Sequence, residues 1–169
     1  MSEIVDFFNN RIFLTVVAAW LVTQLLKFVI HIIIEREVSF ERLFGDGGMP
    51  SGHSATVMTL ALLVGYSYGY SSVLFAICAV IAAVVMHDAS GVRRETGKQA
   101  IFIKELADMM NELTALFGEK NKDIRTEKLK VFVGHTPLQV FCGALVGIAV
   151  SIAYVFIFDV EYCSVLTII

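Results

Sequence analysis

Apolar residues fall into four runs that are separated by polar and charged stretches. The runs cover residues 12–34, 51–66, 72–86 and 137–158. At a rise of about 1.5 Å per residue, the first and the last are long enough to cross a bilayer as helices. A short polar turn joins the second run to the third. This predicts a helical hairpin, with the two halves of a re-entrant element as the alternative.

The long polar segment before the last run, residues 88–134, has a helical pattern in its first part. Its apolar residues recur at helical spacing, at Phe102, Leu106, Met109, Met110, Leu113 and Phe117. The spacing predicts an amphipathic helix that lies in the membrane interface or caps the bundle. The whole chain, residues 1–169, is therefore predicted to be a single all-α domain. It would be an integral membrane bundle of about four transmembrane helices, with the amphipathic helix in the long third loop.

The composition agrees with a membrane protein. Hydrophobic residues make up 57% of the 169 residues and charged residues only 17%, whereas soluble domains are about 45–50% apolar. The net charge of −3 leaves no dominant basic face, so a nucleic-acid partner is not expected. All but two of the 13 Lys and Arg residues fall in the loops after the first and third runs. The positive-inside rule then orients this face to the cytoplasm and both termini to the opposite side.

Three polar motifs lie at this predicted cytoplasmic face. They occupy residues 47–55, 87–99 and 134–139, where the second run begins, the third ends and the fourth begins. Two helix N-termini would therefore point to one place. Their free N–H groups and positive dipole ends attract anions, and glycines let the backbone approach a bound oxyanion closely.

The side chains of these motifs suit phosphoryl transfer. Each helix start carries a histidine, His53 and His135, and Arg93, Arg94 and Lys98 supply positive charge between them. One histidine can attack phosphorus while the other protonates the leaving oxygen. An anion hole with two imidazoles and a cation cluster therefore predicts a phosphate site.

The same residues carry a resemblance to a known family. The segments are Gly-Met-Pro-Ser-Gly-His-Ser-Ala at 48–55, Asp-Ala-Ser-Gly-Val-Arg-Arg at 88–94 with Gly-Lys-Gln-Ala at 97–100, and Gly-His-Thr-Pro at 134–137. In this order they resemble the divergent branch of the type 2 phosphatidic acid phosphatase superfamily. This branch comprises membrane proteins related to acid phosphatases and vanadium-dependent haloperoxidases. The resemblance covers most of the chain.

The resemblance implies a metal-independent phosphatase that needs no cofactor and forms a phosphohistidine intermediate. His135 would be the nucleophile and His53 the general acid toward the leaving group. The groups that it implies for phosphate binding are Ser51, the Gly52 amide, Arg93, Arg94 and Lys98. Which of the three cations contacts phosphate stays open.

The chain departs from the superfamily pattern in two respects. No Arg and Lys motif precedes Pro50, and Leu129 stands six residues before the nucleophile, where the superfamily has an arginine. Gln139 stands four residues after it, where the superfamily has an acid. An amide can accept a hydrogen bond from an imidazole but does not stabilise imidazolium with a full charge. Thr136 and Gln139 also fit a capping box, and Asp88 is expected to pair with one of the arginines.

These observations predict a phosphatase or phosphotransferase acting on a phosphomonoester or a diphosphate. The motifs lie at headgroup level, so the substrate would be lipid-linked. The alternatives are a non-enzymatic protein that binds or moves an anionic lipid or solute, and a degenerate member with a structural role. In those cases the histidines would belong to structural caps and the cations would anchor the protein to lipid headgroups.

Two further features have a structural interpretation. Gly143 and Gly147 form a close-packing face on the last run, which would serve either the bundle itself or a homodimer. A metal site built from His53, His87, His135 and Asp88 is disfavoured, because no helical His-x-x-x-His or Cys pair supports it.

Overall fold

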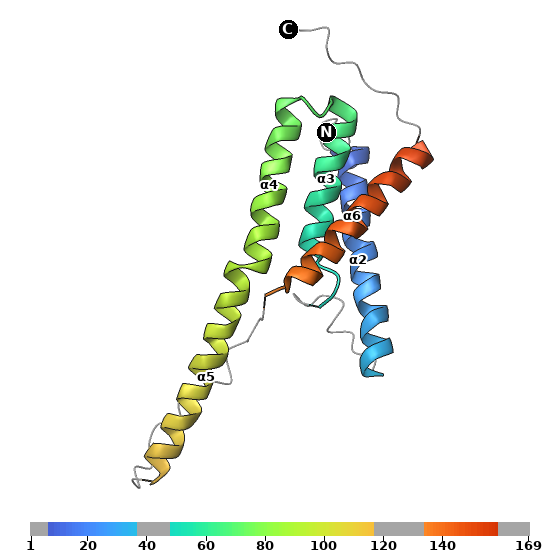
Figure 1. The fold of residues 1–169 in the computed structure, drawn as a ribbon. Coiled ribbons are helices and arrows are strands. Elements are labelled where there is room, and N and C mark those ends of the chain that lie inside the picture. Colours follow the sequence, from blue (N-terminus) through green and yellow to red (C-terminus); the bar gives the residue numbers. More distant parts are fainter. Residues whose placement is uncertain (1–6, 37–47, 117–133, 159–169) are drawn as a thin grey trace.

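The computed structural model describes residues 7–36, 48–116 and 134–158. No strand occurs in these ranges, and the all-α prediction is confirmed. The helices that lie wholly within them are α2 (Arg11–Glu35), α3 (Gly52–Tyr68), α4 (Val73–Ser90), α5 (Val92–Leu116) and α6 (Pro137–Phe158), shown in Figure 1. Both termini, most of the first loop, the predicted stripe position Phe117 and Leu129 lie outside the described residues.

Polar caps set the starts of the helices. The side chains of Asn10, Ser51 and Ser72 accept hydrogen bonds from the backbone three residues on, at the starts of α2, α3 and α4. These bonds satisfy amides that have no partner inside a helix. Most helix ends lie within two residues of the ends of the predicted apolar runs. Helix α6 has the predicted bounds.

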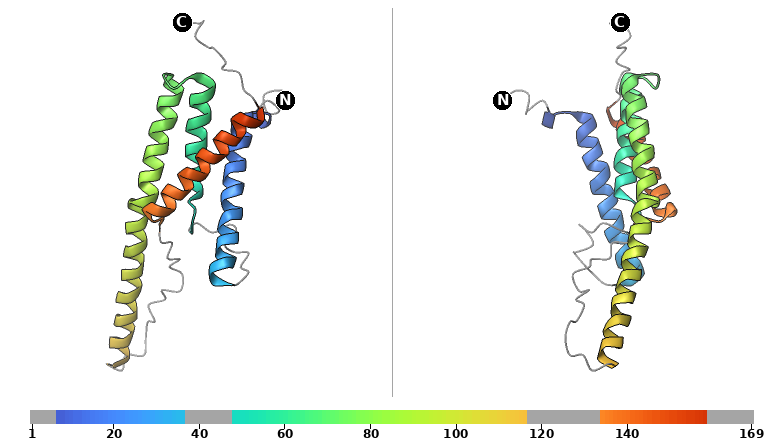
Figure 2. Two further views of the ribbon diagram at one scale, coloured as in Figure 1. Left: turned by 45° about the vertical axis from the view of Figure 1, so that its right-hand side comes forward. Right: turned by 90° about the vertical axis from the view of Figure 1, so that its left-hand side faces the viewer.

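Helix α3 is the centre of the bundle, with α4 on one side and α2 and α6 on the other (Figures 1 and 2). Helix α6 crosses it at close range. A Cβ atom at Gly147 would lie 2.6 Å from the Ala55 carbonyl oxygen, and one at Gly143 would collide with the Ser51 carbonyl. The Thr59 hydroxyl donates to the Gly147 carbonyl at 3.2 Å. The predicted close-packing face is thus used within the chain, in the contact between α3 and α6.

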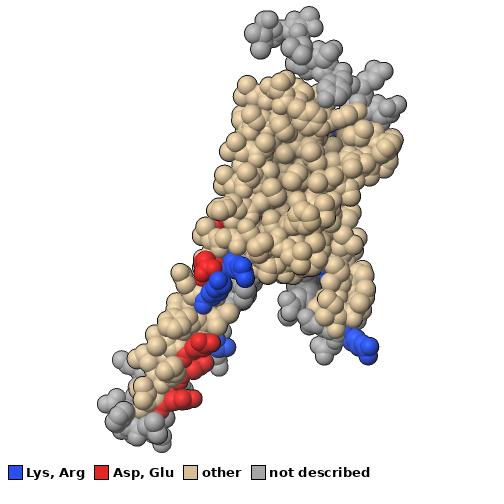
Figure 3. Space-filling model, in the orientation of Figure 1, with Lys and Arg blue, Asp and Glu red and all other residues tan. Residues whose placement is uncertain are grey.

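The outer faces of the bundle are apolar and exposed. Ile33, Val73 and Phe156 are 69%, 74% and 82% exposed, and in Figure 3 charged side chains show on the body of the bundle only as small areas at its edges. Within the described ranges, Arg11–Ile34, Val73–Thr114 and Pro137–Phe158 are long and apolar enough to span a membrane. Helix α3, with 17 residues, is shorter. Helix length and composition therefore identify three of the four predicted crossings.

The predicted amphipathic helix is present as α5, but the third segment and the placement of this helix differ from the prediction. Helix α4 does not end at residue 86 but continues to Ser90, and α5 follows after Gly91 alone. The Gly91 amide donates to His87 and the Gly91 carbonyl accepts from Glu95, so helical hydrogen bonding crosses the junction. As a result α5 extends the direction of α4 away from the bundle, and it neither caps the bundle nor lies across its end (Figures 1 and 2). Its apolar stripe is exposed, as at Phe102, which is 65% exposed.

The contact between α3 and α6 gives a testable prediction. Gly147→Val should lower the free energy of unfolding by about 1–3 kcal/mol, because the added methyl groups meet the α3 backbone. Ala149→Val adds the same kind of bulk on an exposed face of α6 and should have little effect. Thermal unfolding in detergent measures both. Equal melting temperatures for the two variants would contradict the packing described here.

Candidate active site

The first residues of α3 and α6 lie side by side at one end of the bundle. The Ser51 amide donates to the Gln139 carbonyl at 2.9 Å, which joins the residue before α3 to the third residue of α6. Gly143 lies against the Ser51 carbonyl one turn further along α6. The predicted meeting of two helix starts is therefore present in the structure (Figure 1).

The two motif histidines face each other at this meeting point. The ring centroids of His53 and His135 lie 6.2 Å apart, with their planes inclined by 60°. His135 is buried, with 6% of its surface exposed, whereas His53 is exposed. This separation is compatible with contact of both rings to a single tetrahedral anion.

The start of α3 provides amide donors beside these rings. Ser51 is fully buried and caps the helix: its hydroxyl oxygen accepts from the Ser54 amide at 3.4 Å and the Ser54 hydroxyl at 3.1 Å. The amides of Gly52 and His53 belong to the first turn, where no helical residue lies four positions back to accept from them. These two N–H groups therefore project from the positive end of the helix dipole.

The start of α6 is closed by its own cap. The Thr136 amide donates to the Gln139 side-chain oxygen at 2.9 Å, and the Gln139 amide donates to the Thr136 hydroxyl at 3.3 Å. Pro137 has no N–H group to offer. Helix α6 thus contributes a histidine, while the amides of Thr136 and Gln139 are used within its own cap.

Gln139 also lies beside the His135 ring. Its Oε1 is 3.3 Å from the His135 Nδ1. A carbonyl oxygen can only accept a hydrogen bond, so this contact requires the proton on Nδ1 and places the ring's lone pair on Nε2. The tautomer selected is the one that a nucleophilic histidine needs.

The cations of the second motif differ in their placement. A Cβ atom at Gly134 would collide with the backbone of Arg93 and Arg94, so the first turn of α5 is in contact with the residue before His135. The Arg93 Nε lies 2.9 Å from the Asp88 carboxylate, and the predicted pairing of Asp88 with an arginine is confirmed. Lys98 pairs instead with Glu95 at 2.6 Å, one turn further along α5. Figure 3 shows charged side chains gathered where α5 leaves the bundle.

A buried lysine on α2 was missed as a site residue by the sequence analysis. Lys27 is 7% exposed, and its Nζ lies 3.9 Å from where a Cβ atom of Gly52 would be. Its ammonium group is therefore at the start of α3. A lysine inside an apolar run is costly in hydrocarbon and for that reason alone indicates function. No sequence motif marks it: it is one of the two basic residues that lie outside the loops after the first and third apolar runs.

The remaining histidines lie outside this cluster. His87 is exposed near the end of α4, and His31 is half-buried on α2. Among the described residues, no three His, Cys, Asp or Glu side chains form a group that could hold a metal ion.

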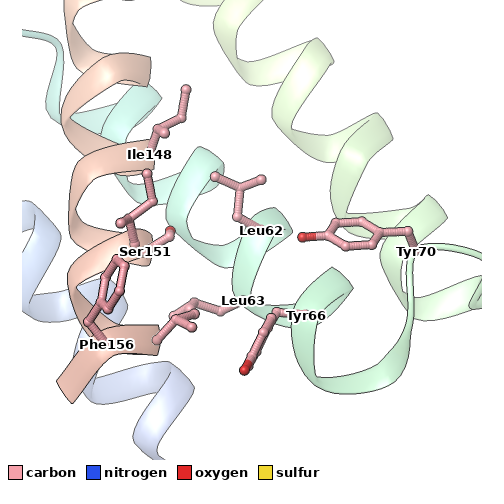
Figure 4. A pocket seen from close by; sticks show the side chains of 9 residues that line it. Leu62, Leu63, Tyr66, Tyr70, Ile148, Ser151 and Phe156 are labelled. Atoms are coloured by element: carbon pink, nitrogen blue, oxygen red, sulfur yellow. The ribbon is translucent and has the colours of Figure 1, made fainter. Parts of the chain in front are cut away.

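A separate groove lies at the other end of α3. It has a volume of about 320 Å³ and is lined by apolar side chains of α3 and α6, with Tyr66, Tyr70 and Ser151 as its polar members (Figure 4). The Ser151 hydroxyl donates to the Gly147 carbonyl. The groove carries no histidine or charged side chain, so it is distinct from the histidine cluster.

Fold and site together define an all-α membrane protein with two histidine motifs at adjoining helix starts. The model of the Divergent PAP2 family matches residues 8–150, and the chain belongs to this family. It is 35% identical over 160 residues to a Bacillus subtilis (strain 168) protein named "Uncharacterized membrane protein YuiD". That similarity covers 90% of this chain and 99% of the relative. No solved structure matches the chain.

Proposed function

We propose that this protein is a membrane phosphatase or phosphotransferase that acts on a phosphomonoester or diphosphate attached to a lipid. The observation that carries the proposal is the 6.2 Å separation of the His53 and His135 rings beside the start of α3. The family name supports the same reaction class. The two histidines are not needed to cap the helix starts, because Ser51 already caps α3 and Thr136 already caps α6.

Phosphate binding would use the start of α3. The amides of Gly52 and His53 and the ammonium of Lys27 are donors at one point, and the burial of Lys27 strengthens its interaction with an anion because less water screens its charge. Arg93 and Arg94 would add charge from α5, with Asp88 fixing the Arg93 guanidinium. Lys98, paired with Glu95 one turn away, is the least suited of the sequence candidates.

The chemical step would pass through a phosphohistidine. The His135 Nε2 lone pair attacks phosphorus and forms the P–N bond while the P–O bond to the leaving group breaks. His53, protonated, gives its proton to the leaving oxygen. His53 then takes a proton from water, whose oxygen attacks phosphorus, and the P–N bond breaks to release phosphate and restore His135.

A non-enzymatic anion binder is the second candidate, and Gln139 is the observation that favours it. An amide orients the ring but leaves the imidazolium of the transition state without a full countercharge. The same helix end, Lys27 and the two histidines would then hold an anionic headgroup without cleaving it.

Phosphate release from lipid phosphates separates the two candidates. Purified protein without added metal should release phosphate from phosphatidic acid or a prenyl diphosphate, and orthovanadate should inhibit the release. His135→Ala should lower turnover by about 1,000-fold or more, because the nucleophile is removed. His87→Ala, at an exposed histidine outside the cluster, is the matched control and should retain activity.

Binding of these lipids by the wild type with no release of phosphate would refute the phosphatase and support the binder.

The same assay tests the membrane orientation that we propose from the distribution of Lys and Arg. Sealed inverted vesicles expose the cytoplasmic face and should hydrolyse an impermeant phosphomonoester. Activity only in right-side-out vesicles would reverse the orientation.

Gln139→Glu should raise turnover on the order of tenfold, because a carboxylate stabilises the imidazolium that the amide only orients. Glutamate keeps the capping box with Thr136, so the melting temperature should not fall. Gln99→Glu on the exposed side of α5 makes the same change of charge away from His135 and serves as the control. Unchanged or lower turnover in a folded Gln139→Glu protein would count against this role of Gln139.

A further inference from the structure

Helix α2 turns a polar face toward the start of α3. A Cβ atom at Gly52 would lie 3.5 Å from the Trp20 Cδ1 and 3.9 Å from the Lys27 Nζ, so these two α2 side chains reach the same point. Gln24 lies four residues after Trp20 and three before Lys27, and positions with this spacing share one face of a helix. Gln24 is therefore on the face of α2 that meets the start of α3.

Gln24 is a buried polar side chain on this face of α2. Its exposed fraction is 8%, and among the residues that the structure describes its Oε1 has no hydrogen-bond partner. The neighbouring Thr23 is satisfied by the Ala19 carbonyl at 2.7 Å. A buried, unpaired amide oxygen costs free energy comparable to a lost hydrogen bond, and such groups commonly mark a ligand or function.

An amide oxygen can only accept, so its partner must carry a proton. The other groups at this point, the Gly52 and His53 amides and the Lys27 ammonium, are all donors. These donors can bind the unprotonated oxygens of an anion. The Gln24 oxygen is an acceptor beside them, and it can bind a protonated oxygen of the same ligand, a P–OH group. A terminal phosphoryl group can carry such a proton, because its second ionisation has a pKa of about 6, whereas sulfate and phosphodiesters have none near neutral pH.

We propose that Gln24 is a specificity-determining residue of the anion site, and that its side-chain oxygen accepts a hydrogen bond from the P–OH of a terminal phosphoryl group. This inference rests on the proposed function and names a residue that would select its substrate class over other anions. Phosphomonoesters and the terminal phosphate of a diphosphate fit the site. Phosphodiesters and sulfate esters leave the Gln24 oxygen unpaired next to an anionic oxygen and are rejected.

Binding of inorganic phosphate and of sulfate to the purified protein tests the proposal without any variant. The two anions are tetrahedral and similar in size, but at pH 7 only phosphate keeps a proton. The wild type should bind phosphate about tenfold more tightly, as expected for one hydrogen bond to a buried acceptor. Isothermal titration in detergent, without added divalent metal, gives both affinities.

Gln24→Met keeps the length of the side chain and removes the acceptor. In this variant phosphate affinity should fall to that of sulfate, while sulfate affinity stays the same or rises. Gln99→Met on the exposed side of α5 is the matched control and should keep the tenfold preference.

Three outcomes overturn the role of Gln24. The first is equal binding of the two anions by the wild type, and the second is binding of neither anion. The third is an equal loss of both affinities in Gln24→Met, which would show that the Gln24 side chain acts as a hydrogen-bond donor to both anions. Failure of the proposed function is separable from these outcomes. A Gln24-dependent phosphate preference in a protein that hydrolyses no lipid phosphate would support Gln24 as a selective ligand of an anion binder and refute the phosphatase.

Discussion

The close contact between α3 and α6 is the constraint on which the site depends. Gly143 and Gly147 let α6 approach the α3 backbone, and the Ser51 amide closes the contact at the helix starts through its bond to the Gln139 carbonyl. In hydrocarbon there is no hydrophobic force to draw two helices together, so small residues and interhelical hydrogen bonds supply the attraction. The same contact that stabilises the bundle brings the His53 ring and the His135 ring to one point.

The two helix starts have different tasks because their caps differ. Ser51 caps α3 with its side chain and leaves the Gly52 and His53 amides directed outward, whereas the Thr136 and Gln139 box closes α6 upon itself. One helix is therefore suited to hold an anion and the other to hold an imidazole in a fixed tautomer. Helix α2 completes the arrangement from the third side with polar groups that would be costly in lipid without a function.

Much of the fold follows from the sequence. Alternation of apolar runs with charged loops is enough to predict an all-α membrane bundle, and the Thr136-Pro137 pair predicts the start of α6 to the residue. The straight passage from α4 into α5 was not predictable in the same way, because Gly91 and the charges around it look like a loop. Its helical hydrogen bonds and the Asp88–Arg93 ion pair continue the helix where composition alone suggests a break.

Those residues of the candidate site that belong to a sequence motif could be predicted. The histidines, Ser51, Gly52 and Gln139 were found because each helix start carries its own signature. Lys27 and Gln24 were not, since they lie on a helix that has no motif and meet α3 only through the packing of the bundle. Which cation lies beside an anion is a property of tertiary contacts, and a pattern along one chain does not contain it.

An experimental structure of the protein with orthovanadate tests the central claim most directly. The account predicts density for one tetrahedral or trigonal-bipyramidal anion between His53 and His135, in contact with the Gly52 amide at the start of α3. Vanadate bound at another place, or histidine rings that are turned to opposite sides of the bundle, would contradict it.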